Sequence, residues 1–403
     1  MNPLLEGRPG LGRVLDALDR DGEEARIVGG AVRDWLIGRG VRSDIDIATT
    51  ATPEEVTRRA RAAGLKAVPT GIEHGTVTLV AEGEPYEVTT LREDVETDGR
   101  RARVMFGRSW EHDAQRRDFT MNALYLTRTG ELVDLVGGAA DAEAGRVRFI
   151  GDADVRIRED YLRILRLFRF HAAFGKGPLN SEALAAAMRN RDGLSRLSRE
   201  RVRAETLKLL VAPRAGETLA DMQRAGLLEP VLGRPGDVDT FARLAEIEDG
   251  LGLPADGVRR LGALAVREEA DAEALREGLR LSNAEAARLL ALAGPAPTPG
   301  MCEKGQKAFI YRMGRQAFQD RALIAFARSR APLDDAGWRA LAGIAADWPI
   351  PIFPLKAADF LALGLTPGPG LGAALKSAEE AWVEAGFPMN REALAIIART
   401  AAA

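Results

Sequence analysis

The first 150 residues carry two alternating patterns of apolar and polar positions. Short runs rich in β-branched residues follow the two-residue period of strands, at residues 26–28, 45–48, 76–81, 86–91 and 124–127. Helical spacing appears between them at residues 31–37 and 53–63, where Thr52 and Pro53 suit a helix cap and a first turn. The order of these elements predicts a domain of mixed α and β structure.

After residue 150 the strand signals fade and helical spacing dominates. Helices are expected at residues 157–174, 181–189, 198–211, 215–225 and 373–385, with glycine- and proline-containing breaks at 175–178, 233–236 and 294–300. We therefore predict an α+β fold, in which a mixed-sheet head is followed by an all-helical neck and an all-helical body and tail. The predicted domains are residues 1–145, 146–252 and 253–403.

Composition narrows the possible chemistry. The 403 residues are 46% hydrophobic and 29% charged, which is typical of a globular protein of two or three domains. A single cysteine, Cys302, excludes an internal disulfide framework and a multi-thiolate metal site, and three scattered histidines do not suggest a histidine-based metal cluster. Neither a bilayer-spanning segment of about 20 apolar residues nor a secretory signal is apparent, so we expect a cytoplasmic protein without membrane contact.

The net charge of −3 hides a basic region. Residues 146–208 hold 15 Lys and Arg against 8 Asp and Glu, so the remainder of the chain is net acidic. Most of the basic residues are arginines, whose guanidinium groups suit bidentate contacts with phosphates and base edges. This region is either a track for nucleic acid or a solvated helical face, and charge alone does not separate the two.

A turn near the N-terminus has the features of a phosphate site. Residues 27–34 read IVGGAVRD, a short strand that meets two glycines and then a helix. Gly30 lets a ligand approach the backbone at the helix N-terminus, where free N–H groups face an anion, and Arg33 follows one turn later. The alternative is a purely structural turn.

Paired carboxylates follow about a dozen residues later. Asp44 and Asp46 share one face of the predicted strand, while Ile45 and Ile47 face the core. Two adjacent carboxylates repel each other unless a cation lies between them, and Mg²⁺ favours one or two carboxylates together with substrate phosphates. Glu87, on a later strand, either completes this site, polarises an attacking hydroxyl, or is a surface residue.

A predicted helix through Asp160 carries the third set of candidates. Arg163, Arg166 and Arg169 follow at three-residue intervals among apolar residues, and Asp160 is expected to pair with Arg163. Cytosine and adenine both present an amine donor beside a ring-nitrogen acceptor, so an aspartate with an arginine accepts both bases and rejects guanine and uracil. The alternative is a structural ion-pair network.

Four motifs together resemble the class II tRNA nucleotidyltransferases, a family of bacterial CCA-adding enzymes and related poly(A) polymerases. They are GGAVRD at 29–34, DID at 44–46, RRDFTMNAL at 116–124 and REDYLRILR at 158–166, with weaker likeness at 197–201 and 363–370. The resemblance implies that residues 1–145 are a nucleotidyltransferase head.

The same resemblance assigns roles to individual residues. Asp44 and Asp46 are implied to bind Mg²⁺, Gly30 and Arg33 to hold the triphosphate, and Arg117 to contact the nucleotide, with Asp118 and Asn122 near the sugar. The Glu-Asp-x-x-Arg motif is implied to select the base, with Arg166 and Arg169 lining the same site. A polar, aperiodic segment between Arg92 and Arg108 predicts a mobile loop, which the resemblance links to complete CCA addition or to addition of A.

These observations predict an enzyme that adds CCA to the 3′ end of tRNA from CTP and ATP, with Mg²⁺, without a nucleic-acid template and with release of pyrophosphate. The alternatives are a poly(A) polymerase of the same family and an enzyme that adds only A to tRNA. A catalytically inactive RNA-binding module is the alternative of another class, and the costly pairing of Asp44 with Asp46 argues against it.

Overall fold

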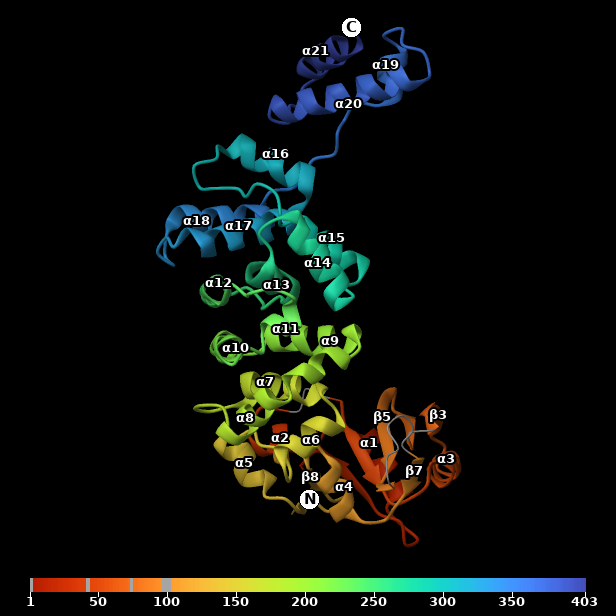
Figure 1. Ribbon diagram of the computed structural model, residues 1–403. Helices are drawn as coiled ribbons and strands as arrows, with labels where there is room; N and C mark the ends of the chain where they lie inside the picture. The colour runs from red at the N-terminus through yellow and green to blue at the C-terminus, as the bar shows by residue number, and fades with distance from the viewer. Residues whose placement is uncertain (1–2, 41–43, 73–74, 96–102) are drawn as a thin grey trace. The chain divides into compact units, whose positions relative to one another are not determined.

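The computed structural model describes residues 3–40, 44–72, 75–95 and 103–403. Contacts divide the chain into two compact units, Met1–Pro230 and Val231–Ala403. The first unit contains all the strands of the described chain, so the predicted α+β fold with a mixed-sheet head is confirmed (Figure 1). The predicted divisions after residues 145 and 252 stay predictions.

The head is built on one seven-stranded sheet. In spatial order its strands are β3 (Lys66–Gly71), β4 (Thr76–Ala81), β5 (Glu84–Thr90), β2 (Asp46–Thr49), β1 (Ala25–Val28), β8 (Leu124–Leu126) and β9 (Leu132–Asp134). Only β2 and β5 run parallel among these neighbours, and the other pairs are antiparallel. The central position of β2 places its first residue, Asp46, between Val28 at the end of β1 and Glu87 in the middle of β5.

Five of these strands were predicted from their hydrophobic pattern. The alternation is clearest in β4, where Val77, Leu79 and Ala81 are buried and the residues between them are half-buried. The edge strands β3 and β9 were missed because neither has a fully buried residue, and β3 also contains Pro69 and a register irregularity. Edge strands of this kind carry little periodicity for a sequence to reveal.

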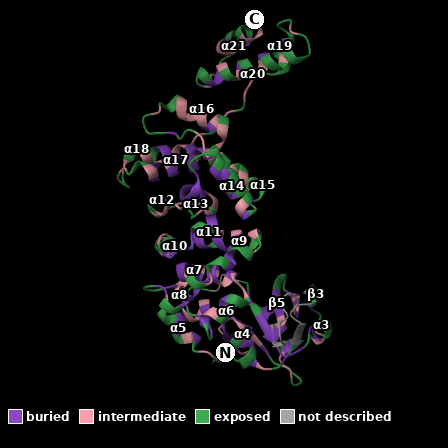
Figure 2. Ribbon diagram, in the orientation of Figure 1, coloured by how far each residue is buried: buried purple, intermediate pink, exposed green. Residues whose placement is uncertain are grey.

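The first unit also contains helices, and those near the start of the chain contact the strands of this sheet. They are α1 (Pro9–Leu18), α2 (Gly30–Leu36), α3 (Pro53–Ala62), α4 (Trp110–Arg116), α5 (Gly138–Ala144), α6 (Ala153–Glu159), α7 (Leu162–Phe174), α8 (Ser181–Arg189), α9 (Arg199–Leu210) and α10 (Ala215–Arg224), with short 3₁₀ turns at Thr120–Asn122 and Arg191–Arg196. Figure 2 shows α7 as largely buried, in keeping with its apolar sequence. The helix α11 (Glu229–Leu232) spans the boundary between the units.

The predicted continuous helix over residues 157–174 is wrong. The chain leaves helical geometry at Asp160, which has φ −153° and ψ 106° and separates α6 from α7. The Asp160 carboxylate accepts a hydrogen bond from the backbone N–H of Leu162 at 3.1 Å, as aspartate does where a helix begins. Asp160 therefore lies in a bend between two helices, and its side chain is not on a helical face.

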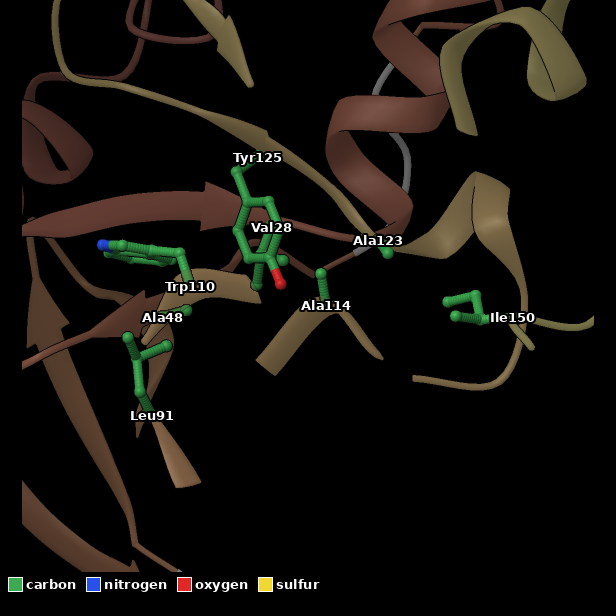
Figure 3. Close-up of a cluster of buried hydrophobic side chains, with 8 residues drawn as sticks. All are labelled: Val28, Ala48, Leu91, Trp110, Ala114, Ala123, Tyr125 and Ile150. Atoms are coloured by element: carbon green, nitrogen blue, oxygen red, sulfur yellow. The ribbon is translucent and has the colours of Figure 1, made fainter. Parts of the chain in front are cut away.

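A compact apolar cluster supports the sheet on the side of β1, β2 and β8. It consists of Val28, Ala48, Leu91, Trp110, Ala114, Ala123, Tyr125 and Ile150 (Figure 3). Trp110 and Tyr125 meet edge to face with ring centroids 5.3 Å apart. The Tyr125 hydroxyl donates to the fully buried Asp113 carboxylate at 2.8 Å, so this core is tied to the polar residues beside it.

All the regular secondary structure described in the second unit is helical. Its helices are α12 (Val238–Gly250), α13 (Gly257–Ala265), α14 (Glu269–Leu279), α15 (Asn283–Leu290), α16 (Glu303–Met313), α17 (Arg315–Ser329), α18 (Ala336–Asp347), α19 (Ala357–Leu361), α20 (Pro369–Glu384) and α21 (Arg391–Ala402). Apolar clusters form around Phe318 and around Trp382, and the buried Glu248 binds both Arg259 and Arg260. Among the described residues, no helix has the length and apolar character needed to cross a membrane.

Replacing Gly138 with alanine tests how tightly the head is packed. A Cβ atom at Gly138 comes within 2.0 Å of the Thr120 carbonyl oxygen, and backbone cannot move aside cheaply. We expect Gly138→Ala to lower the stability of the protein by about 2–3 kcal/mol, measured by thermal or urea unfolding.

Gly12→Ala is the matched control. This position lies inside α1 of the same unit and has open space around the new methyl group. It should leave the stability unchanged or raise it by about 0.5–1 kcal/mol. Equal stability of the Gly138→Ala variant and the wild type contradicts the packing described here.

Candidate active site in the first unit

One pocket of about 490 Å³ gathers most of the residues singled out in the sequence. It is lined by Gly29, Gly30, Arg33, Asp46, Arg117, Asp118, Asn122, Asp160, Leu162, Arg163, Arg166, Arg169, Phe170, Phe174 and Arg201. Six arginines and three aspartates give this lining a formal charge of +3. A concave, positively charged surface of this size suits a polyanionic ligand such as a triphosphate.

The glycine turn shapes one wall of the pocket. Gly29 has a φ of +77°, which favours glycine, and its N–H donates to the Leu124 carbonyl at 3.0 Å. Gly30 begins α2, and Arg33 lies one turn along that helix. The predicted strand–turn–helix is therefore confirmed, and Gly30 and Arg33 both line the pocket.

Arg33 is held from three directions. Its Nε and Nη2 donate to Asp34 at 2.9 and 2.8 Å, and its Nη1 donates to the Asn122 side-chain oxygen at 2.6 Å. Its guanidinium also lies 3.8 Å from the centre of the Phe174 ring. Burial lowers the pKa of Arg33, which Asp34 opposes, so this cation is desolvated but fixed.

The carboxylates occupy the geometry expected of an Asp-x-Asp strand. Asp44 and Asp46 are exposed while Ile45 and Ile47 are buried, as predicted. Asp46 faces the pocket and stands directly beside Glu87 in the parallel pairing of β2 with β5, whereas Asp44 and Glu87 are not among the lining residues. Of these three acidic residues, Asp46 is the one that lines the pocket.

Electrostatics at Asp46 favour a cation. Partial desolvation raises its pKa to about 6, and the nearby charges of Glu87 and Asp44 add to this rise while Arg117 opposes it. Ionisation of Asp46 is unfavourable without a nearby positive charge. The carboxylate oxygens at this position therefore fit a divalent cation. The described residues contain no cluster of three or more His, Cys, Asp or Glu side chains arranged to hold a metal, so such an ion must take further ligands from phosphate oxygens and water.

Arg117 and Asp118 reach the pocket from the segment after α4. Arg117 Nε donates to the buried Asp113 at 3.0 Å, and although burial opposes ionisation, Arg117 and Arg116 hold the pKa of Asp113 below its ordinary value. Asp118 binds Arg166 at 2.6 Å and accepts from Asn122 at 3.1 Å. Arg117, Asp118 and Asn122 thus all line the pocket, as the motif suggested.

The expected ion pair between Asp160 and Arg163 is not formed. Asp160 instead binds Arg201 of α9 at 2.6 Å, and Arg163 binds Glu159 at 2.5 Å. The reason is the bend at Asp160, which removes the i, i+3 relation that a continuous helix provides. Both Asp160 and Arg163 still line the pocket.

Two residues of α9 were missed as parts of this site. Arg201 lines the pocket, although the sequence placed it only in the basic region of residues 146–208, interpreted as a nucleic-acid track or a solvated helical face. Glu205 is buried. Its carboxylate binds Arg169 at 2.5 Å and lies 3.8 Å from Arg166. Their four-residue spacing places both on one face of α9, which is the only hint that the sequence offers.

The segment between Arg92 and Arg108, predicted as a mobile loop, begins and ends in paired strands. β6 (Arg92–Val95) and β7 (Arg103–Phe106) form an antiparallel pair, so a loop along the whole segment is wrong. Residues 96–102, where the loop prediction also falls, lie outside the described residues.

Comparisons with known proteins agree with this geometry. The family model described as "Poly A polymerase head domain" matches residues 25–148, and one described as "Probable RNA and SrmB- binding site of polymerase A" matches residues 179–236. The chain is 34% identical to CCA tRNA nucleotidyltransferase 1, mitochondrial, of Danio rerio over 96% of this chain and 89% of that protein. It is 41% identical to the CCA-adding enzyme of Leuconostoc citreum over 58% of this chain and 57% of that protein.

A solved structure extends the likeness to the fold of nearly the whole chain. The Bacillus stearothermophilus CCA-adding enzyme, solved in complex with CTP, aligns over 99% of this chain and 98% of that one, with a TM-score of 0.78 and 29% identity. Fold and pocket together therefore define a nucleotidyltransferase with a poly(A)-polymerase-type head. More narrowly, the chain belongs to the CCA tRNA nucleotidyltransferase family, as its motifs indicated.

The raised pKa of Asp46 predicts a stability gain on its replacement. The ionised carboxylate costs folding energy at pH values above about 6, and protonation of the folded protein relieves this cost as the pH falls through 6. At pH 7.5, in buffer that contains a metal chelator, the free energy of unfolding of Asp46→Asn should exceed that of the wild type. The expected difference is about 1 kcal/mol, after allowance for solvent screening. The difference should shrink by pH 5, as measured by urea unfolding.

Asp192→Asn is the control for this experiment. The Asp192 side chain is fully exposed, and the substitution should leave stability unchanged at both pH values. An Asp46→Asn variant that is less stable than the wild type at pH 7.5 contradicts the electrostatic account of this site.

Proposed function

We propose that this protein adds C, C and A to the 3′ end of tRNA, using CTP and ATP and no nucleic-acid template. The observation that carries the proposal is that one pocket joins Asp46, Arg33 and the Asp160–Arg163 segment. These residues come from distant parts of the chain and supply, in turn, a cation ligand, a phosphate ligand and base-reading groups. The cytoplasm is the compartment that we expect for this activity.

The reaction that this arrangement supports is attack of the tRNA 3′ hydroxyl on the α-phosphate of the nucleotide. A new phosphodiester bond forms, the bond to the β-phosphate bridging oxygen breaks, and pyrophosphate leaves. Arg33 and the backbone at Gly30 hold the triphosphate, and Arg117, whose Nη1 lies beside Gly29, contacts the nucleotide. Fixed positive charge of this kind acts by positioning and by stabilising developing negative charge.

Asp44 and Asp46 would hold Mg²⁺, and Glu87 stands beside them. When bound, the ion neutralises charge on the phosphates and activates the attacking hydroxyl. The raised pKa of Asp46 and the nearby charge of Asp44, which contributes to that rise, support this assignment. Glu87 adds negative charge beside Asp46 and strengthens its demand for a cation.

Base choice falls to Asp160 and Arg163. A carboxylate oxygen accepts from the exocyclic amine of cytosine or adenine, and a guanidinium donates to the neighbouring ring nitrogen. Uracil and guanine present the opposite pattern and leave buried polar groups unpaired. Arg166 and Arg169, fixed by Asp118 and Glu205, add positive charge to the same nucleotide site.

The reaction can be tested with tRNA that lacks its last three nucleotides. We expect incorporation of C, then a single A, then a stop, when the protein is supplied with Mg²⁺ and each labelled nucleotide in turn. Long A tails without C identify a poly(A) polymerase, and A addition only to tRNA that already ends in CC identifies an A-adding enzyme. Absence of incorporation by folded protein favours an RNA-binding module.

Replacing the paired aspartates separates catalysis from binding. Asp44→Ala and Asp46→Ala should each lower turnover by at least about a thousandfold, because charge stabilisation at the α-phosphate is lost. Both variants should retain the affinity of the wild type for tRNA in a filter-binding or mobility-shift assay. Turnover within a few-fold of wild type for Asp46→Ala refutes the assigned role.

A further inference from the structure

The helix α9 carries two charged residues on one face that bind residues lining the pocket. Arg201 and Glu205 are four residues apart, so they lie one above the other. Arg201 binds Asp160 at 2.6 Å, and Glu205 binds Arg169 at 2.5 Å. A single helix therefore holds both the bend residue Asp160 and Arg169 of α7.

The Asp160 carboxylate is fixed through both of its oxygens. Oδ1 accepts from the Leu162 backbone N–H at 3.1 Å, and Oδ2 accepts from Arg201 Nη2 at 2.6 Å. The first contact belongs to the local bend, but the second comes from a residue 41 positions away in sequence. Arg201 is thus the side chain that sets the rotation of the Asp160 carboxylate about its Cβ–Cγ bond.

Arg163 cannot perform this task in the observed geometry. Its Nη1 donates to Glu159 at 2.5 Å and to the Arg156 carbonyl at 2.8 Å, so it is oriented independently of Asp160. The two base-reading residues therefore have separate supports, Glu159 for Arg163 and Arg201 for Asp160. Base selection then depends on both supports holding their partners at the right angle.

We propose that Arg201 is a positioning residue for base selection, which acts by orienting the Asp160 carboxylate toward the amine of cytosine or adenine. This inference rests on the proposed function. Arg201 is half exposed, with 50% of its side chain accessible, so its loss should alter selection without unfolding the protein. Without it, the Leu162 N–H is the remaining contact in the described chain that holds the Asp160 carboxylate, and a less firmly oriented carboxylate accepts poorly from the amine and excludes uracil poorly.

The test measures kcat/KM for CTP and for UTP with tRNA lacking its last three nucleotides. Arg201→Gln should lower the ratio of CTP to UTP about tenfold, the scale of one lost charge-assisted hydrogen bond. Arg201→Lys should recover part of the ratio, because an ammonium group still donates to Asp160. Arg224→Gln, which breaks an exposed ion pair with Asp221 in α10, is the matched control and should leave the ratio unchanged.

A double-mutant cycle with Asp160→Ala separates positioning from general damage. If Arg201 acts through Asp160, Arg201→Gln should have no further effect on the CTP to UTP ratio in the Asp160→Ala background. Independent, multiplicative effects of the two substitutions overturn the proposal, as does an unchanged ratio in Arg201→Gln alone. Failure of the wild type to add C at all is a different result, because it removes the proposed function before any variant is compared.

Discussion

The site depends on pairing each guanidinium that faces the pocket with a carboxylate of the protein. Arg33 binds Asp34, Arg117 binds Asp113, Arg163 binds Glu159, Arg166 binds Asp118, Arg169 binds Glu205 and Arg201 binds Asp160. Six cations in one pocket repel each other strongly when partly desolvated. Individual partners make this density of charge tolerable and fix each guanidinium before a ligand arrives, which is how a site lowers the reorganisation that binding and reaction demand.

The carboxylates of Asp46 and Glu87 on the sheet, in contrast to these arginines, lack an ion-pair partner among the described residues. Asp46 and Glu87 stand side by side across β2 and β5, and the pKa of Asp46 rises to about 6 through desolvation first and the charge of Glu87 second. The arginine pairs are satisfied within the protein, whereas this acidic group is not. The protein therefore keeps an uncompensated negative charge at Asp46, where a cation and a triphosphate are expected to meet. This charge lowers the stability of the folded protein.

Much of this arrangement could be predicted from the sequence. Alternation identified β4, because it has one buried face, and the four motifs named most of the residues that line the pocket. The partners of those residues could not be predicted. A bend at Asp160 replaced the expected helix, since an aspartate can satisfy a following N–H and stop a helix without any change in apolar spacing. Arg201 and Glu205 came from a helix about 40 residues away, and only the tertiary packing of α9 on α7 decides such pairs.

The use of arginine for these pairs has a geometric reason. All the basic residues that line the pocket in the described chain are arginines. Arg166 turns its Nε and Nη2 edge to Asp118 at 2.7 and 2.6 Å, so the remaining Nη1 is not used by that carboxylate. A lysine has one ammonium centre and cannot divide its donors between a supporting carboxylate and a ligand in fixed directions. A planar guanidinium group has two hydrogen-bonding edges, so one edge can bind a supporting carboxylate while the other binds a phosphate or a base. In this way a rigid pocket lined by many charged side chains can still bind a nucleotide.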